Sequence, residues 1–381
     1  MMARQSRPAT TSLMICSWGP RNSAWPNTRC RISWGVMAAW IAKAFPACYA
    51  FSMRRVAISQ ASQHAGLAAL LVAAIWILWT ELRPPAIAAN QPRHSIAITA
   101  APLAGAGSKI GPFRLTSAAV LTSPEQAFGG LSGLAALPDG RLLAVTDAGD
   151  WLLFRPGAMS GEIGSITMPG DVKSDRDAEA IAFTPDGHTL ISLEQQHRIL
   201  SFAGHGPPLT PAGAPLYRTD TMGWPPNGGG ESLAVLGEGS LIWIAENAAT
   251  ADGARTALLV APAGLTRRIM IDAVDGFAPT DAVALDETHL LVLHRRFTGA
   301  ETAAAISIVD LAPVLAGGSA APGRLLARWG RDGKWPVDNM EGIALVRRKT
   351  GPPIVYLVSD DNFSAAQRTL LLQLEIIAPL R

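Results

Sequence analysis

One short pattern occurs five times between residues 132 and 344 of this 381-residue chain and constrains the fold more than any other feature. It consists of an acidic or small residue, a small residue, an aliphatic residue and an alanine. Successive copies begin 47, 52, 50 and 60 positions apart. Repeats of this length indicate stacked structural units of one kind. The copies are Ser132-Gly-Leu-Ala135, Glu179-Ala-Ile-Ala182, Glu231-Ser-Leu-Ala234, Asp281-Ala-Val-Ala284 and Glu341-Gly-Ile-Ala344.

Each copy is followed by a turn and a second apolar run, as expected for two paired strands. Asp139-Gly140 and Asp186-Gly187 separate such runs, and Asp-Gly is a strong hairpin signal because glycine accepts the positive φ of a tight turn. Small antiparallel sheets that recur about every 50 residues are typical of propeller blades. We therefore predict an all-β propeller. A helical solenoid is disfavoured because no amphipathic 3.6-residue pattern runs far enough.

The number of blades depends on residues 90–130, which precede the first copy of the repeat. They contain two strand-like pieces, at residues 96–99 and 113–121. These pieces either close the ring against the last blade or belong to a degenerate sixth blade. We favour six blades, with five as the alternative, in a domain that spans residues 90–381.

The charge of the chain is divided unevenly. Residues 1–89 hold nine basic residues and one acid, a net charge of +8, whereas the remaining 23 basic and 29 acidic residues give −6. A nucleic-acid surface requires a basic body with clustered Lys and Arg. The mildly acidic propeller region therefore argues against nucleic-acid binding. Separately, we expect a monomer that acts on a small anionic or ester substrate.

Residues 53–89 have the features of an export signal. Arg54-Arg55 precede an uncharged apolar run at residues 65–79, and an Ala-x-Ala end follows at residues 86–89. The run is slightly shorter than the roughly 20 residues of a spanning helix, so it either directs cleavage or anchors the protein in the inner membrane. We expect a periplasmic or exported protein whose only membrane contact is this segment.

Residues 1–52 fit neither the signal nor the propeller, because they mix Arg, Pro, Cys and Trp without periodicity. We interpret them as a non-native or disordered extension, with translation beginning at Met53. All three cysteines of the chain lie within this segment. The exported body therefore has no disulfide, thiolate metal site or cysteine nucleophile.

The repeat predicts a cluster of carboxylates at the propeller axis. The innermost strand of each blade lines the central channel, so Glu179, Glu231, Asp281 and Glu341 are expected to converge there. Crowded carboxylates raise one another's pKa unless a cation offsets them. Oxygen-rich sites of this kind suit Ca²⁺. The alternative is that these acids cap strands, bind backbone N–H groups or face solvent.

The second strands also end in polar residues, which adds candidates for the same opening. Asp147, Glu194, Glu246 and the run Asp360-Asp361-Asn362 follow such strands. Asn339 shares a strand face with Glu341, as Asp177 does with Glu179. His294 follows an apolar strand in the same way as Glu194. Next to it, Arg295 or Arg296 is expected to point inward and bind an anionic substrate.

These motifs resemble the phytase-like family, described as having an esterase-like activity of phytase, and its exported bacterial branch. The likeness extends over about residues 125–378. It rests on SDRDAEAIA at 174–182, NGGGESLA at 227–234, LVLHRRF at 291–297, DNMEGIA at 338–344 and LVSDDNFS at 357–364 with QRTLLL at 367–372.

The resemblance implies a β-propeller hydrolase of phosphoesters or esters that uses Ca²⁺. It implies metal ligands in the Asn-x-Glu-Gly motif, in its earlier copies and in the closing Asp-Asp-Asn. Ser132 and His294 depart from this pattern, because an acid is expected at each place. The implied metal ligands are Glu179, Glu231, Asn339, Glu341, Asp360 and Asp361.

The leading hypothesis is a metal-dependent hydrolase that acts at the axial opening. In it, Arg295 or Arg296 binds the anion, and Asp281 or His294 accepts a proton from the attacking water. Two alternatives remain open. One is a binding or scaffolding propeller with a structural calcium ion, and the other is a lactonase-type hydrolase that differs only in its substrate.

Overall fold

The computed structural model describes residues 91–380 except 169, 171, 213–216, 219–222, 252, 263, 273, 275, 300 and 332. The expected extension at residues 1–52 and the expected signal or anchor at 53–89 lie outside the described residues. Within the described residues, no helix is long and apolar enough to cross a membrane.

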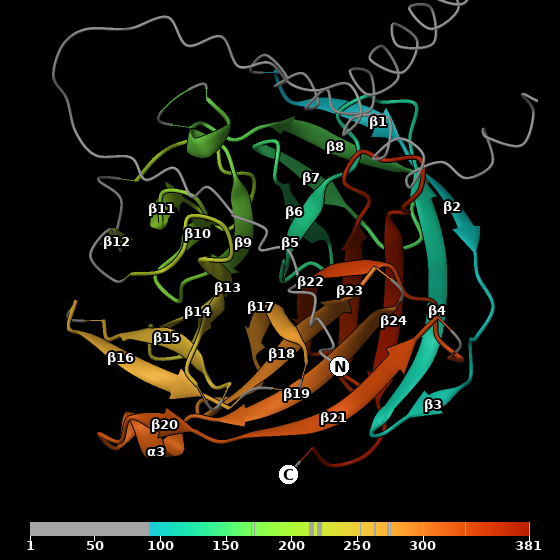
Figure 1. Cartoon of the computed structure of the whole chain (residues 1–381). Helices are drawn as coiled ribbons and strands as arrows, with labels where there is room; N and C mark the ends of the chain where they lie inside the picture. Colours follow the sequence, from blue (N-terminus) through green and yellow to red (C-terminus); the bar gives the residue numbers. More distant parts are fainter. Residues whose placement is uncertain are drawn as a thin grey trace, which may run out of the picture. The chain divides into compact units, whose positions relative to one another are not determined.

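The described residues form five sheets arranged as the blades of a ring, which confirms the all-β propeller (Figure 1). In the first two blades, neighbouring strands are antiparallel and the first strand of each repeat is innermost. Blade 1 contains β5 (Leu131–Ala136), β6 (Leu142–Thr146), β7 (Asp150–Phe154), β8 (Ser160–Ser165) and β1 (His94–Ala97). A 3-10 turn at Lys173–Asp175 precedes blade 2, which contains β9 (Ala178–Phe183), β10 (His188–Leu193), β11 (Arg198–Ala203) and β12 (Tyr217–Arg218).

The third and fourth blades follow the same plan with small additions. The chain from blade 4 adds a short strand, β20, parallel to the outer strand of blade 3. Blade 3 contains β13 (Gly230–Val235), β14 (Leu241–Ala249), β15 (Arg255–Val260), β16 (Thr266–Ile271) and β20 (Ala320–Ala321). Blade 4 contains β17 (Ala278–Ala284), β18 (His289–Phe297), β19 (Thr302–Asp310), the short helix α3 (Ala312–Leu315) and β21 (Gly323–Gly330).

The fifth blade is completed by strands from both ends of the described chain. The long N-terminal strand β4 pairs antiparallel with β24, the last strand, and so closes the ring. Residues 94–122 therefore complete blades 1 and 5, and the sixth blade that we favoured is not formed. The blade contains β22 (Asn339–Val346), β23 (Ile354–Asp360), β24 (Leu370–Ile376), β4 (Phe113–Thr122), β2 (Thr99–Pro102) and, beside β4, β3 (Lys109–Ile110).

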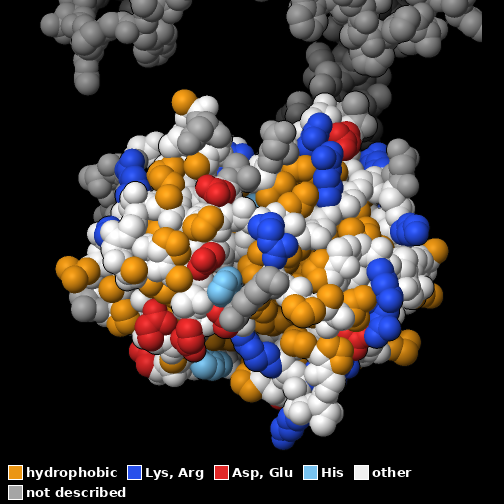
Figure 2. All heavy atoms as spheres, turned by 90° about the horizontal axis from the view of Figure 1, so that it is seen from below, with side chains coloured by type: hydrophobic (Ala, Val, Ile, Leu, Met, Phe, Trp, Pro, Cys, Tyr) orange, Lys and Arg blue, Asp and Glu red, His pale blue; other side chains and the backbone are white. Residues whose placement is uncertain are grey.

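The apolar core lies between the blades. Five clusters of buried side chains each join two neighbouring sheets, including the pair formed by the last blade and the first. A single blade cannot bury both faces, so each depends on its two neighbours. The expected turns are present as well, since Gly140 and Gly187 adopt φ of 82° and 94°. On the face shown in Figure 2, Lys and Arg side chains are scattered among apolar ones and do not form a continuous basic surface.

Candidate functional site

A β-bulge interrupts the innermost strand of every blade near its start. In each case one residue is skipped in the pairing with the second strand. A bulge re-aims the side chain of the extra residue and often occurs next to a functional site. Four of the five bulge residues line one cavity. The bulge residues are Ser132, Glu179, Glu231, Thr280 and Glu341, and Thr280 is the one outside the cavity.

A second set of equivalent residues lies on or just after the second strand of each blade, beside the bulge. In each blade, the residue before the bulge pairs with a residue of the second strand. The residue that comes directly after this partner belongs to the set. All five line the same cavity. Four are acids and the fifth, in blade 4, is an arginine. The set is Asp147, Glu194, Glu246, Arg295 and Asp360.

The cavity between these residues has a volume of about 270 Å³. Its lining includes two cations, Lys173 and Arg295, and eight carboxylates, so full ionisation would leave a net charge of −6. Asparagine, glutamine and serine side chains supply further oxygen atoms. The carboxylates are those of Asp147, Asp177, Glu179, Glu194, Glu231, Glu246, Glu341 and Asp360.

Burial and mutual repulsion raise the pKa values of these acids. Burial, with Asp177 and Glu194 nearby, raises the pKa of Glu179 well above its ordinary value. Burial likewise raises the pKa of Glu341 to about 8, although Arg295 opposes the increase. The pKa of Asp360 rises to about 7, chiefly through burial and then through Asp147. Without a cation the carboxyls are therefore partly protonated at neutral pH, and a bound cation would favour release of these protons.

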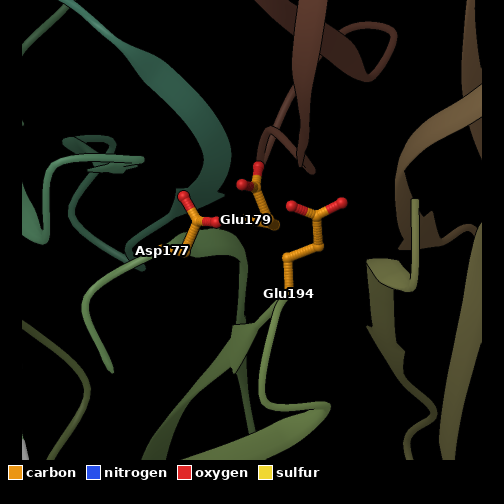
Figure 3. Close-up of side chains that lie close together, drawn as sticks. All are labelled: Asp177, Glu179 and Glu194. Atoms are coloured by element: carbon orange, nitrogen blue, oxygen red, sulfur yellow. The ribbon is translucent and has the colours of Figure 1, made fainter. Parts of the chain in front are cut away.

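Three of the carboxylates lie close enough together to share one metal ion. One oxygen from each of Asp177, Glu179 and Glu194 falls within 4.8 Å of the others, and Figure 3 shows the three side chains converging. Asp177 precedes β9, Glu179 is the bulge residue of β9, and Glu194 follows β10. An all-oxygen donor set fits a hard cation such as Ca²⁺.

The other cation of the lining, Lys173, lies at the edge of this group. Its Nζ is 3.4 Å from Asp147 Oδ2 and 3.5 Å from Asp177 Oδ1, and half of its side chain is exposed. Such an exposed pair contributes little to stability. No feature of the sequence distinguishes Lys173 from other lysines.

Arg295 is held inside the cavity by three oxygen-bearing side chains. Its guanidinium donates to Glu341 Oε1 at 2.6 Å, to Asn339 Oδ1 at 2.7 Å and to Glu246 Oε1 at 2.8 Å. Although burial lowers the pKa of Arg295, Glu341 and Glu246 raise it above its ordinary value. Arg295 therefore stays charged, but these contacts, with a further one from Nε to Glu246 at 3.2 Å, take most of the donors expected to bind a substrate anion.

Asp281 and His294 do not line the cavity, contrary to expectation. In blade 4 the bulge falls at Thr280, one residue earlier than the repeat suggests, so Asp281 points elsewhere. Its carboxylate accepts backbone N–H groups of Ala282 and Ile343 at 2.8 and 2.9 Å. His294 Nε2 lies 2.7 Å from Ser307 Oγ. Burial, together with Arg255, lowers the pKa of His294 to about 3, so the ring is neutral at ordinary pH.

Asp361 and Arg296 also lie outside the cavity lining. Asp361 accepts hydrogen bonds from the backbone of Gly130 and Phe363 and from the Thr369 hydroxyl, so it holds two loops together. Arg296 pairs with Glu301 at 3.1 Å. Its side chain lines a separate groove.

This groove has a volume of about 480 Å³ and adjoins the cavity, because Arg295, Asn339 and Asn362 line both. Arg296 and Arg331 lie along it, and the side chain of Phe297 is 72% exposed. The groove thus offers positive charge and an apolar surface beside the acidic cavity.

The structure brings most of the predicted metal ligands to one cavity. Glu179, Glu231, Asn339, Glu341 and Asp360 line the cavity, and Asp361 does not. Asp177 and Glu194, which form a close group with Glu179, are polar residues near strand ends and are not among the ligands that the resemblance implies. The sequence signal for Glu194 and Glu246 is their place directly after an apolar run, although Glu246 lies within β14 in the structure.

The fold and cavity define a five-bladed propeller with an acidic axial site. A protein-family model described as phytase-like, with esterase-like activity of phytase, matches residues 126–363. The chain belongs to this family, and the membership supports an enzymatic function. No curated protein sequence matches the chain.

Solved structures give weaker likenesses. Endo-arabinase from Bacteroides thetaiotaomicron is 13% identical over 67% of this chain and 96% of its own, with a TM-score of 0.44. Virginiamycin B lyase from Staphylococcus aureus is 11% identical over 68% and 71%, with a TM-score of 0.37. A luciferin-regenerating enzyme is 11% identical over 65% and 92%, with a TM-score of 0.38. These scores are too low to support an inference about activity.

Proposed function

We propose that this protein is a metal-dependent hydrolase of phosphoesters or carboxylic esters that acts at the axial cavity. The observation that carries the proposal is the gathering of eight carboxylates around a cavity of about 270 Å³, against two cationic side chains in the part of the lining that the structure describes. Such a group is costly to bury without a cation. Family membership supports the hydrolytic class.

Asp177, Glu179 and Glu194 would hold the ion, with Glu231 beside them. Their hard oxygen donors favour Ca²⁺ over a metal that prefers nitrogen or sulfur. A bound Ca²⁺ supplies Lewis acidity to a phosphoryl or acyl oxygen and lowers the pKa of water. Among the other expected ligands, Asn339 and Glu341 contact Arg295, and Asp360 accepts a hydrogen bond from Asn339 Nδ2 at 3.4 Å.

Asp360 takes the role of proton acceptor that was expected of Asp281 or His294. It lines the cavity, and its pKa of about 7 lies near the operating pH, as is best for a general base. The backbone N–H of Asn362 donates to Asp360 Oδ1 at 2.6 Å and fixes its orientation. Asp281 instead accepts a hydrogen bond from the backbone N–H of Ile343, and His294 contacts Ser307. Neither residue lines the cavity.

The groove beside the cavity would hold the remainder of the substrate. Arg296 and Arg331 supply positive charge for an anionic group, and Phe297 supplies an apolar surface. We also propose that the protein acts after export, which is supported by the signal-like residues 53–89 and by the lack of cysteine in residues 90–381.

The test is a hydrolase panel of aryl phosphomonoesters, phytate, short acyl esters and lactones, each assayed with added Ca²⁺ and after chelation. Turnover of a phosphoester or ester that disappears on chelation and returns with Ca²⁺ is expected. Equal rates with and without chelator, or no turnover in a Ca²⁺-loaded sample, would contradict the proposal. Turnover confined to lactones would identify the lactonase alternative, and Ca²⁺ binding without turnover the scaffolding one.

A further inference from the structure

Arg295 interrupts a ring of acids that the fold would otherwise complete. The equivalent positions in the other four blades are Asp147, Glu194, Glu246 and Asp360. Arg295 directly follows His294, the partner of Pro279, which precedes the bulge residue Thr280, so it occupies the same place by register. Among the described residues, blade 4 supplies no carboxylate to the cavity lining, because its bulge residue is Thr280 and Asp281 accepts hydrogen bonds from the backbone.

The guanidinium lies where several oxygen atoms converge, in the kind of place that a metal cation would take. Glu246, Asn339 and Glu341 each place a side-chain oxygen between 2.6 and 2.8 Å from its terminal nitrogens. Glu246 and Glu341 are themselves buried, with 6% and 8% of their surface exposed. Carboxylate and amide oxygens of this kind are also the ligands that Ca²⁺ takes.

The two halves of the cavity are therefore neutralised differently. Arg295 offsets Glu246 and Glu341 on one side. On the other side, Asp177, Glu179 and Glu194 approach within 4.8 Å, and Lys173 reaches Asp177 only at 3.5 Å from an exposed position. The guanidinium of Arg295 is covalently attached and cannot leave the cavity. A metal ion held by Asp177, Glu179 and Glu194 would be exchangeable.

We propose that Arg295 occupies a second cation site of this cavity and so limits the protein to one exchangeable metal ion. Removal of the guanidinium would leave Glu246, Asn339 and Glu341 free to bind a further ion. The assignment of the ion to Asp177, Glu179 and Glu194 rests on the proposed function. The gain of one further ion when the Arg295 guanidinium is removed does not depend on it. Arg295 is thus a residue that sets metal stoichiometry rather than one that binds the substrate anion.

The experiment counts Ca²⁺ ions bound per chain by equilibrium dialysis and isothermal titration calorimetry. The full chain is compared with Arg295→Ala, with the charge-conserving Arg295→Lys, and with Arg114→Gln as a control. Arg114 pairs with Glu375 on the outer part of blade 5, so the control removes an arginine–carboxylate pair outside the cavity lining. Circular dichroism verifies folding in Ca²⁺.

The expected counts are one ion for the natural chain, two for Arg295→Ala, and one each for Arg295→Lys and Arg114→Gln. The further change Glu246→Gln in the Arg295→Ala background should return the count to one. If Arg295→Ala unfolds even with Ca²⁺, the comparison uses Arg295→Gln.

The two proposals fail in different ways. Absence of any ion on the natural chain would overturn the metal-dependent function, whereas an equal count for the natural chain and the Arg295 variant would overturn the inference about Arg295. Two ions on the natural chain would also overturn it.

Discussion

The raised pKa values of Asp360 and Glu341 predict an unusual pH dependence of stability in the metal-free protein. Both carboxyls ionise near pH 4 when the chain is unfolded, but in the folded state their pKa values are about 7 and about 8. Between these limits the folded state binds more protons than the unfolded state. The free energy of unfolding must therefore fall as the pH rises from about 5 to about 8.

The size of the effect follows from the pKa shifts. At about 1.4 kcal/mol per pKa unit, each group would contribute on the order of 4 kcal/mol if it titrated alone. The two groups and their neighbours titrate together, so the combined loss is expected to be a few kcal/mol, a large part of the roughly 5–15 kcal/mol stability of a typical domain.

Urea unfolding of dialysed, metal-free protein at several pH values measures this loss directly. The variants Asp360→Asn and Glu341→Gln remove one titrating group each and should flatten the curve, which separates their contribution from that of exposed pairs such as His94–Glu125. Addition of Ca²⁺ should stabilise the protein more at about pH 8 than at about pH 5, because fewer protons must then be released. Stability that stays level or rises with pH in the metal-free protein, with the same slope in the variants, would refute the reasoning.

Three further predictions concern single residues. Glu179→Gln should weaken Ca²⁺ binding at least tenfold, measured by calorimetry, because it removes one of the three converging carboxylates; unchanged affinity would rule out the triad as the ion site. Asp281→Asn should lower the free energy of unfolding by about 1–3 kcal/mol, since it disturbs two buried backbone hydrogen bonds, yet leave Ca²⁺ affinity unchanged; weakened binding would place Asp281 in the site after all. Arg331→Ala should raise KM for substrates with an anionic leaving group several-fold and leave neutral esters unaffected, and an equal effect on both would remove the groove from substrate binding.

The repeat made the fold predictable, because its spacing and its turn residues follow directly from blade geometry. The number of blades was harder to predict. Residues 94–122 pair with strands at both ends of the ring, and nothing in their local pattern shows that β4 joins β24 rather than a new sheet. Pairing between distant segments is a property of the closed ring and not of any single strand.

The site was predictable mainly from the repeat. Glu179, Glu231 and Glu341 were found because each is both the repeat's acid and the bulge residue. In blade 4 the bulge moves by one residue, which turns Asp281 away and brings Arg295, rather than His294, to the ring position. A shift of one residue reverses the direction of a strand side chain, and the sequence carries no visible mark of it.

A crystal structure of the protein soaked with Ca²⁺, with Tb³⁺ as an anomalous substitute, tests the central claim most directly. A single anomalous peak coordinated by Asp177, Glu179 and Glu194 is the predicted result. A cavity without any peak at saturating ion, or an ion bound only at the outer surface, would contradict the account.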